Sequence, residues 1–273
     1  MRKLTLAGAL VASAAALMIG VAPAGAITGG TIDGTRHPEA GAMLADFGDG
    51  LSVLCSGTLI SPRVFLSAGH CTAFLASVGI GAHDVYVTFD PSWDPANPGT
   101  AYRGTYYTDP QYGYSGQGGA SDPHDIAVIV LDQAIQGITP ARLPSAGLLD
   151  RLPLKSATFT AVGYGTVRDI KTTGPHAFYF DGTRRWVEQG FLSLQKAWLK
   201  LNMNFATGNG GSCYGDSGGP HFYGGPDSNN LVATTITGDA VCVATDKDYR
   251  LDTASAMSFL SGFTQYGAYT YWG

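Results

Sequence analysis

Short apolar runs bounded by turn-forming residues recur along the chain and predict β-strands. Clusters of Gly, Pro, Asn and Asp separate these runs, as residues 90–98 illustrate. Runs of this length, rich in β-branched and aromatic residues, fit strands better than helices. The expected strands are Leu51–Ile60, Val64–Ser67, Val85–Phe89, Ile126–Leu131, Ala157–Gly163 and Leu231–Thr237.

One helix is expected, close to the C-terminal end. Asp252 and Thr253 can cap it, and an apolar stripe follows at helical spacing, formed by Ala254, Met257, Phe259, Leu260 and Phe263. The stretch 188–203 fits a helical period and strand alternation equally, so its assignment stays open. Many strands with one terminal helix predict an all-β architecture, in which residues 140–154 cross between two β halves.

Residues 1–26 have the order of a secretory signal peptide. Two cationic residues precede an uncharged run over residues 4–21, and the run ends in the A-x-A pattern Ala22-Pro-Ala-Gly-Ala26. A membrane anchor is the alternative, but the Ala- and Gly-rich composition and the cleavage pattern favour a signal that is removed. Cleavage after Ala26 exposes Ile27, whereas cleavage after Ala24 leaves two further residues. We expect a secreted, extracellular protein that is free of the membrane once the signal is cut.

Composition narrows the classes of function. The 273 residues suit one large domain or two small ones, and 11% aromatic residues are too many for a disordered chain. Charged residues make up only 14%, and glycines number 38, which suits strands joined by tight turns. Without the two cations of the signal, the formal net charge falls from −5 to −7. Such a chain has no electrostatic basis for binding nucleic acid or an anionic membrane.

The four cysteines are expected to form disulfides, because secretion exposes the chain to oxidising conditions. Three pairings are open to four cysteines, and the spacing favours the two local loops Cys55–Cys71 and Cys213–Cys242. In the loop-entropy model each is worth about 3–4 kcal/mol. A metal site is not expected, since no C-x-x-C or His/Cys cluster is present.

The most specific string in the chain is Gly215-Asp-Ser-Gly-Gly-Pro220. Its glycines allow a tight turn that brings successive N–H groups to one point, as a developing oxyanion requires. The string also matches the G-x-S-x-G elbow of α/β-hydrolases, which place an acid and then a histidine after the serine. Only His221 follows Ser217, and no strand–helix alternation is present, so that interpretation is rejected.

A serine nucleophile needs a base, which must then lie upstream. Ser67-Ala-Gly-His-Cys71 places His70 beside a cysteine at the end of an apolar strand. Asp125 lies at the start of another apolar strand, where its carboxylate can accept the imidazole Nδ1–H and hold the useful tautomer. Asp122 and Asp132 are the rival acids, but one lies in a polar turn and the other beyond the strand.

These three motifs occur in His–Asp–Ser order and together resemble the trypsin-like (chymotrypsin-fold) serine proteases, in a bacterial-type secreted form. Three further segments are similar to the family: Ile27-Thr-Gly-Gly30, Cys55-Ser-Gly-Thr-Leu-Ile60 and Val162-Gly-Tyr-Gly165. The resemblance implies an all-β fold of two packed six-stranded antiparallel β-barrels with a C-terminal α-helix and a site in the cleft between the barrels. Residues 27–140 would form the first half and residues 141–273 the second.

The resemblance also implies a role for each motif residue. His70 would be the general base and then the acid, Asp125 would orient it, and Ser217 would be the nucleophile. The oxyanion hole would be the N–H groups of Gly215 and Ser217. Asp216 would receive the ammonium group of Ile27, and the disulfides would be the two that the loop spacing favours. No cofactor or metal is implied, and the partners would be polypeptide substrates and protein protease inhibitors.

The primary specificity pocket is expected from Gly211, Ser212 and Gly238. Gly211 stands where trypsin-type enzymes carry an acid, so small or apolar side chains are expected before the cut, because an unpaired buried cation is costly. Asp248 is the alternative source of a negative charge, which keeps basic specificity open. The strand around Gly238 also departs from the family's Ser-aromatic-Gly pattern, which leaves substrate pairing and pocket width open.

We therefore expect a secreted serine endopeptidase that works through an acyl-enzyme. The alternatives are a non-catalytic secreted binding protein of the same fold and an esterase that uses the same triad. Other polar residues are assigned to the surface: His37, His83, His124, His176 and the pair Arg184-Arg185.

Overall fold

The computed structural model describes residues 27–113, 121–169 and 176–273. The expected signal peptide, residues 1–26, lies outside these ranges. Among the described residues, no helix has the length and apolar character needed to span a membrane.

Six strands of the N-terminal half close into a barrel in the order β2-β3-β4-β7-β6-β5. Every neighbouring pair is antiparallel. Apolar side chains fill the barrel, and all five residues of β7 are buried. The strands are β2 (Ala40–Asp46), β3 (Leu51–Ser61), β4 (Val64–Ser67), β5 (Val85–Thr88), β6 (Tyr102–Thr108) and β7 (Ala127–Leu131).

A second barrel follows, in the order β12-β13-β16-β15-β14-β9, and the pairing of β12 with β9 closes it. Strand β1 (Thr31–Ile32) adds to β12, so the chain first packs on the second barrel and then enters the first. The strands are β9 (Thr158–Gly163), β12 (Arg185–Leu194), β13 (Trp198–Asn202), β14 (Pro220–Tyr223), β15 (Leu231–Gly238) and β16 (Thr245–Arg250).

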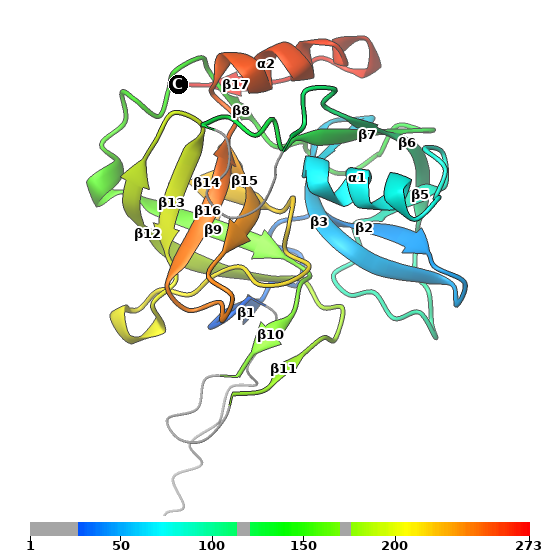
Figure 1. Cartoon of the computed structure of the whole chain (residues 1–273), viewed down its shortest axis with the longest axis horizontal. Coiled ribbons are helices and arrows are strands. Elements are labelled where there is room, and N and C mark those ends of the chain that lie inside the picture. The colour runs from blue at the N-terminus through cyan, green and yellow to red at the C-terminus, as the bar shows by residue number, and fades with distance from the viewer. Residues whose placement is uncertain (1–26, 114–120, 170–175) are drawn as a thin grey trace, which may run out of the picture.

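The two barrels lie side by side in Figure 1, and short elements follow or connect their strands. Helix α1 (Gly69–Ser77) follows β4, and helix α2 (Ala254–Ser261) follows β16. One hydrophobic cluster runs through both barrels, from Leu66 and Ile129 to Phe222 and Leu251. The smaller elements are β8 (Leu143–Pro144), β10 (Val167–Arg168), β11 (Phe178–Tyr179), β17 (Tyr271–Trp272) and the 3₁₀ turns Leu154–Ser156, Phe205–Thr207 and Thr264–Tyr266.

The predicted fold class is confirmed, and each of the six expected strands is present with ends shifted by at most one residue. The open stretch 188–203 proves to be the end of β12, a turn and all of β13. The expectation of a single helix is wrong, because α1 is a second one. Its hydrophobic pattern is weak, and it is held by the disulfide at Cys71 and by a 2.6 Å hydrogen bond between the hydroxyls of Thr72 and Thr108.

Candidate active site

Strand pairing in the first barrel places His70 beside Asp125. Strands β4 and β7 are antiparallel neighbours, and Ser67 at the end of β4 lies opposite Ala127 at the start of β7. The chain continues from Ser67 into α1, which carries His70, and Asp125 precedes β7. Two residues 55 positions apart in the sequence are thereby brought into contact.

The Asp125 carboxylate is completely buried and holds His70 at two points. It accepts a 2.8 Å hydrogen bond from the His70 backbone N–H, and its Oδ2 lies 3.1 Å from His70 Nδ1. Gly69 leaves room for this approach, since a Cβ there would lie 3.2 Å from Asp125 Oδ1. With Nδ1 facing the carboxylate, Nε2 is the nitrogen that remains for chemistry, and the imidazole is 29% exposed.

Ser217 lies on the turn before β14, in the second barrel, and this turn touches the segment that leads to His70. Gly215 and Gly218 have φ angles of +92° and +82°, values that only glycine adopts easily. A Cβ on Gly218 would overlap the Ser67 hydroxyl and lie 2.9 Å from the Ala68 nitrogen. The turn therefore packs directly against the end of β4, just before His70.

Within the described residues, the N–H groups of Gly215 and Ser217 donate to no protein acceptor. Two unpaired amides two positions apart on one turn are the arrangement that an oxyanion hole requires. No hydrogen bond joins the Ser217 hydroxyl to His70 in this part of the chain. In enzymes without substrate that contact is often long and tightens when substrate binds.

Ser56 on β3 joins the two barrels at this point, a role that the sequence motifs do not predict. It is fully buried. Its hydroxyl donates to the Gly215 carbonyl at 3.1 Å and accepts from the Tyr164 N–H at 2.9 Å, and its N–H donates to the Ser217 carbonyl at 2.8 Å. Its position between Cys55 and Gly57 was the only sequence feature that could have indicated this role. Its hydrogen-bond partners Tyr164, Gly215 and Ser217 lie more than 100 residues away in the sequence.

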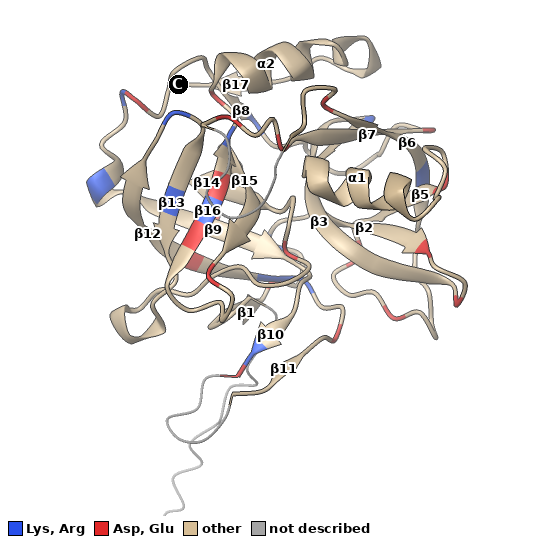
Figure 2. Ribbon diagram, viewed as in Figure 1, with Lys and Arg blue, Asp and Glu red and all other residues tan. Residues whose placement is uncertain are grey.

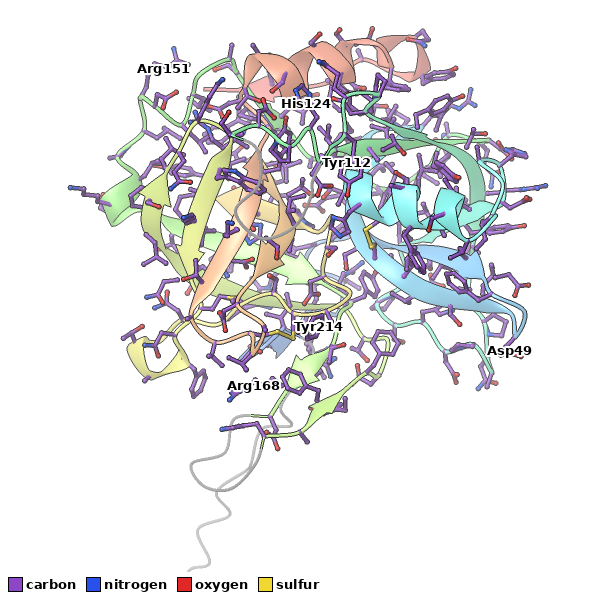
Figure 3. All side chains as sticks on the ribbon, viewed as in Figure 1. Asp49, Tyr112, His124, Arg151, Arg168 and Tyr214 are labelled. Carbon is purple, nitrogen blue, oxygen red and sulfur yellow. A yellow bond between two sulfur atoms is a disulfide. The ribbon has the colours of Figure 1, made fainter. Side chains whose placement is uncertain are left out.

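A pocket of about 170 Å³ opens beside Ser217. Ser212 and Gly238 line it as expected, and Tyr214 crosses its edge, donating a 2.9 Å hydrogen bond to the Ala240 carbonyl. Tyr214 is 59% exposed, and in Figure 3 it lies at the junction between the barrels. The lining residues are 212–214, 217, 235–240 and 242.

Gly211 and Asp248 do not lie on the pocket wall. Gly211 is buried, exchanges backbone hydrogen bonds with Thr28, and has the Met203 side chain where its own Cβ would be. Asp248 is fully buried inside the second barrel. Position 211 therefore contributes no acid to the pocket, and Asp248 cannot contact a substrate directly from the pocket wall.

Asp216 is buried behind the serine turn. It accepts hydrogen bonds from Cys213 N–H and Gly165 N–H, both at 2.8 Å. In the chain that is not cleaved before Ile27, burial outweighs these bonds and raises the pKa of Asp216 to about 7. Ile27 is also fully buried, but no ion pair or hydrogen bond between described residues joins it to Asp216.

The structure contains both expected disulfides, Cys55–Cys71 and Cys213–Cys242. The first connects β3 to α1 next to His70. The second connects the two segments that line the pocket.

Three assignments to the surface are wrong. His37 is buried and pairs with Asp33 at 2.5 Å. Arg184 is 1% exposed and Arg185 is 3% exposed, because both guanidinium groups are paired with carboxylates. Two adjacent arginines are expected to be solvated when the sequence does not show which acids pair with them. His83, by contrast, is 49% exposed.

The family model described as Trypsin matches residues 32–249. The chain belongs to the trypsin family. Its relatives include the snake venom serine protease serpentokallikrein-1 of Protobothrops mucrosquamatus, which is 26% identical over 61% of each chain. The thrombin-like enzyme acutobin of Deinagkistrodon acutus is 28% identical over 62% of each chain. The trypsin-family chain thus spans about three-fifths of the length of these curated relatives. The matches give no support to a bacterial type.

Proposed function

We propose that this trypsin-family protein is a secreted serine endopeptidase that hydrolyses polypeptides through an acyl-enzyme. The observation that carries the proposal is the buried Asp125 carboxylate, which is bonded to the His70 backbone and faces its Nδ1 at 3.1 Å. A buried acid fixed in this way holds one imidazole tautomer. Family membership supports the reaction class, and the name of one relative, a snake venom serine protease, supports secretion.

In the proposed reaction, His70 Nε2 takes the proton of the Ser217 hydroxyl as Oγ bonds to the substrate's carbonyl carbon. The oxygen that becomes negative is stabilised by the N–H groups of Gly215 and Ser217. The C–N bond then breaks, and His70 returns the proton to the leaving amine. Water attacks the acyl-enzyme in the same way, which releases the acid and restores Ser217. No cofactor takes part in these steps.

We propose further that removal of residues 1–26 switches the enzyme on. Ile27 has a φ of +62° in the uncut chain, an unfavourable value for a β-branched residue. A free N-terminus has no preceding carbonyl, so cleavage after Ala26 removes this strain. The new ammonium can then pair with Asp216, whose carboxylate costs free energy to ionise without a cation. This pairing would order the turn that carries Gly215 and Ser217.

Hydrolysis of casein by the secreted protein tests the function. We expect turnover that is lost in Ser217→Ala and in His70→Ala, while both variants stay folded by circular dichroism. Peptide and ester substrates of the same sequence, compared side by side, separate an endopeptidase from an esterase. Folded wild-type protein that turns over neither substrate would support the non-catalytic binding protein.

A further inference from the structure

An imidazole and two carboxylates meet in the core of the second barrel, where the proposed reaction uses none of them. His221 lies on β14. Asp246 and Asp248 lie two positions apart on β16, so both point to the same face of the sheet. All three side chains are fully buried. Each offers one ligand atom, and these atoms all lie within 4.8 Å of one another.

Hydrogen bonding inside the barrel does not satisfy this cluster. Within the described ranges, His221 Nε2 and both oxygens of Asp248 are buried and have no hydrogen-bond partner. The same holds for Oε1 of Gln189, whose Nε2 donates to Asp246 Oδ2 at 2.9 Å. Buried polar groups are nearly always paired. Four such atoms in one place therefore favour a ligand that binds several of them together.

The two carboxylates also have no basic side chain to balance their charge. Among the described residues, only His221 lies within ion-pair distance of Asp246 or Asp248. Lys247 points to the opposite face of β16, against Trp198, and the charged positions of β16 follow one another in Figure 2. Ionised carboxylates in a barrel core are costly without a cation. One divalent cation would neutralise both.

We propose that His221, Asp246 and Asp248 bind one zinc ion, which links β14 to β16 in the core of the second barrel. The ion would stabilise the fold and take no part in the chemistry at Ser217. The inference is therefore independent of the proposed function, and it replaces the expectation that the chain has no metal site.

The spacing and the chemistry of the ligand atoms both fit zinc. Ligand nitrogens and oxygens lie about 2.0–2.2 Å from zinc, so two of them in a tetrahedral site are about 3.4 Å apart. His221 Nε2 and Asp246 Oδ2 are 3.4 Å apart, which is too long for a strong hydrogen bond. An imidazole nitrogen beside carboxylates suits zinc, whereas calcium and magnesium prefer sites made of oxygen atoms alone.

Asp246 is held in place as a metal-binding carboxylate usually is. The Ser212 hydroxyl donates to its Oδ1 at 2.6 Å, and Gln189 Nε2 donates to its Oδ2. Outer contacts of this kind orient a ligand and strengthen its bond to the metal. Ser212 also lines the pocket beside Ser217. The fourth position of the ion would be taken by Gln189 Oε1 or by water that enters past Ser212.

Metal analysis of the processed protein tests the proposal. The protein is produced in medium that contains zinc, purified without a metal-affinity tag and treated briefly with a chelator while it is folded. Elemental mass spectrometry should then find about one zinc ion per chain, as in a closed structural site. Denaturant, added with the disulfides intact, should release the ion to a zinc indicator. Protein refolded with zinc should unfold at a higher temperature than protein refolded with a chelator.

The variants His221→Gln and Asp248→Asn each remove one ligand. Both should hold zinc about tenfold less well or worse, and zinc should no longer raise their unfolding temperature. The matched control is His83→Gln, because His83 Nε2 lies 3.6 Å from Asp132 Oδ2 in a pair of the same chemistry on the surface. This variant should keep the zinc content of the wild type.

Two results would overturn the inference. One is folded wild-type protein that holds no zinc after the chelator treatment and is equally stable with and without added zinc. The other is zinc that His83→Gln loses while His221→Gln and Asp248→Asn retain it. If neither ligand variant folds, the two measurements on the wild type still decide. Because zinc content is measured without a substrate, failure of the proposed function would not affect the result.

Discussion

At the scale of single residues, Ser217 carries the proposed chemistry and little of the fold. Its side chain makes no hydrogen bond within the described residues, so Ser217→Ala should leave the unfolding midpoint unchanged. By comparison with other serine enzymes, kcat should fall about 10⁶-fold. Peptide turnover and thermal unfolding of the same preparation measure the two effects. Retention of wild-type activity would exclude Ser217 as the nucleophile.

Ser56 should behave in the opposite way, because it holds backbone from three segments together. Ser56→Ala removes a donor to the half-buried Gly215 carbonyl and an acceptor for the Tyr164 N–H, which would be left buried and unpaired. We expect a loss of about 1–3 kcal/mol in the free energy of unfolding, together with a lower kcat because Gly215 moves. Denaturant unfolding and steady-state kinetics give these values.

Ser61→Ala is the matched control for that substitution. Ser61 lies on the same strand and is also fully buried, but its hydroxyl has no partner among the described residues. Its removal should leave the protein as stable as before or slightly more so. Equal losses in the two variants would contradict the bridging role of Ser56.

Sequence motifs identify the residues that carry chemistry better than those that support it. His70, Asp125 and Ser217 each occur in a short string whose residue types serve one reaction. Ser56 has no such string, because its partners Tyr164, Gly215 and Ser217 lie in loops of the other barrel and become visible only when the fold is known. Gly211 was recognised by counting back from Ser217, but counting could not reveal that Met203 fills the space beside it.

At the scale of elements, the segment from Ile27 to β1 is expected to control both activity and the pH dependence of stability. With residues retained before Ile27, the folded state holds a proton on Asp216 up to a pKa of about 7, whereas the unfolded chain loses it near 4. The folded form binds the proton more tightly, so stability should fall as pH rises from about 4 to 7, by at most about 4 kcal/mol.

The processed protein should lack this loss, because the Ile27 ammonium keeps Asp216 ionised in the folded state. The comparison uses protein that begins at Ile27 and protein that retains Gly25 and Ala26, unfolded by denaturant at pH 5 and at pH 8. The extended form should also be nearly inactive. Identical pH profiles and equal turnover in the two forms would show that the Ile27–Asp216 switch does not operate.

At the scale of the whole molecule, Arg184 connects the barrels from a buried position. Its guanidinium donates to the carbonyls of Ala40 and Phe89 in the first barrel, at 2.8 and 3.0 Å, and to the Asp33 carboxylate at 2.8 Å. Arg184→Met would leave Asp33 buried without its cation, which costs about 3–5 kcal/mol.

Arg36→Met provides the control, since the Arg36–Asp227 pair is solvent-exposed and worth about 1 kcal/mol or less. Denaturant unfolding should therefore separate the two variants by several kcal/mol. Equal stabilities would mean that Arg184 contributes no more to barrel packing than a surface charge.

The sequence predicts the architecture well because strands with apolar runs form most of the first barrel. It predicts the second barrel less well. Strand β16 carries Asp246, Lys247 and Asp248, so it has no hydrophobic pattern that would predict a strand. Three of its six residues are nevertheless both polar and buried. Helix α1 was not predicted for a different reason. Its helical conformation is stabilised more by tertiary contacts than by its own sequence.

Above all, we propose that Ser217, activated by His70, is the nucleophile of a serine endopeptidase. Covalent labelling of the processed protein with a fluorophosphonate, followed by mass spectrometry of its peptides, tests this most directly. We expect one adduct per molecule, located on Ser217, which is absent from Ser217→Ala and strongly reduced in His70→Ala. An unlabelled wild-type protein that is fully folded, or an adduct on another residue, would contradict it.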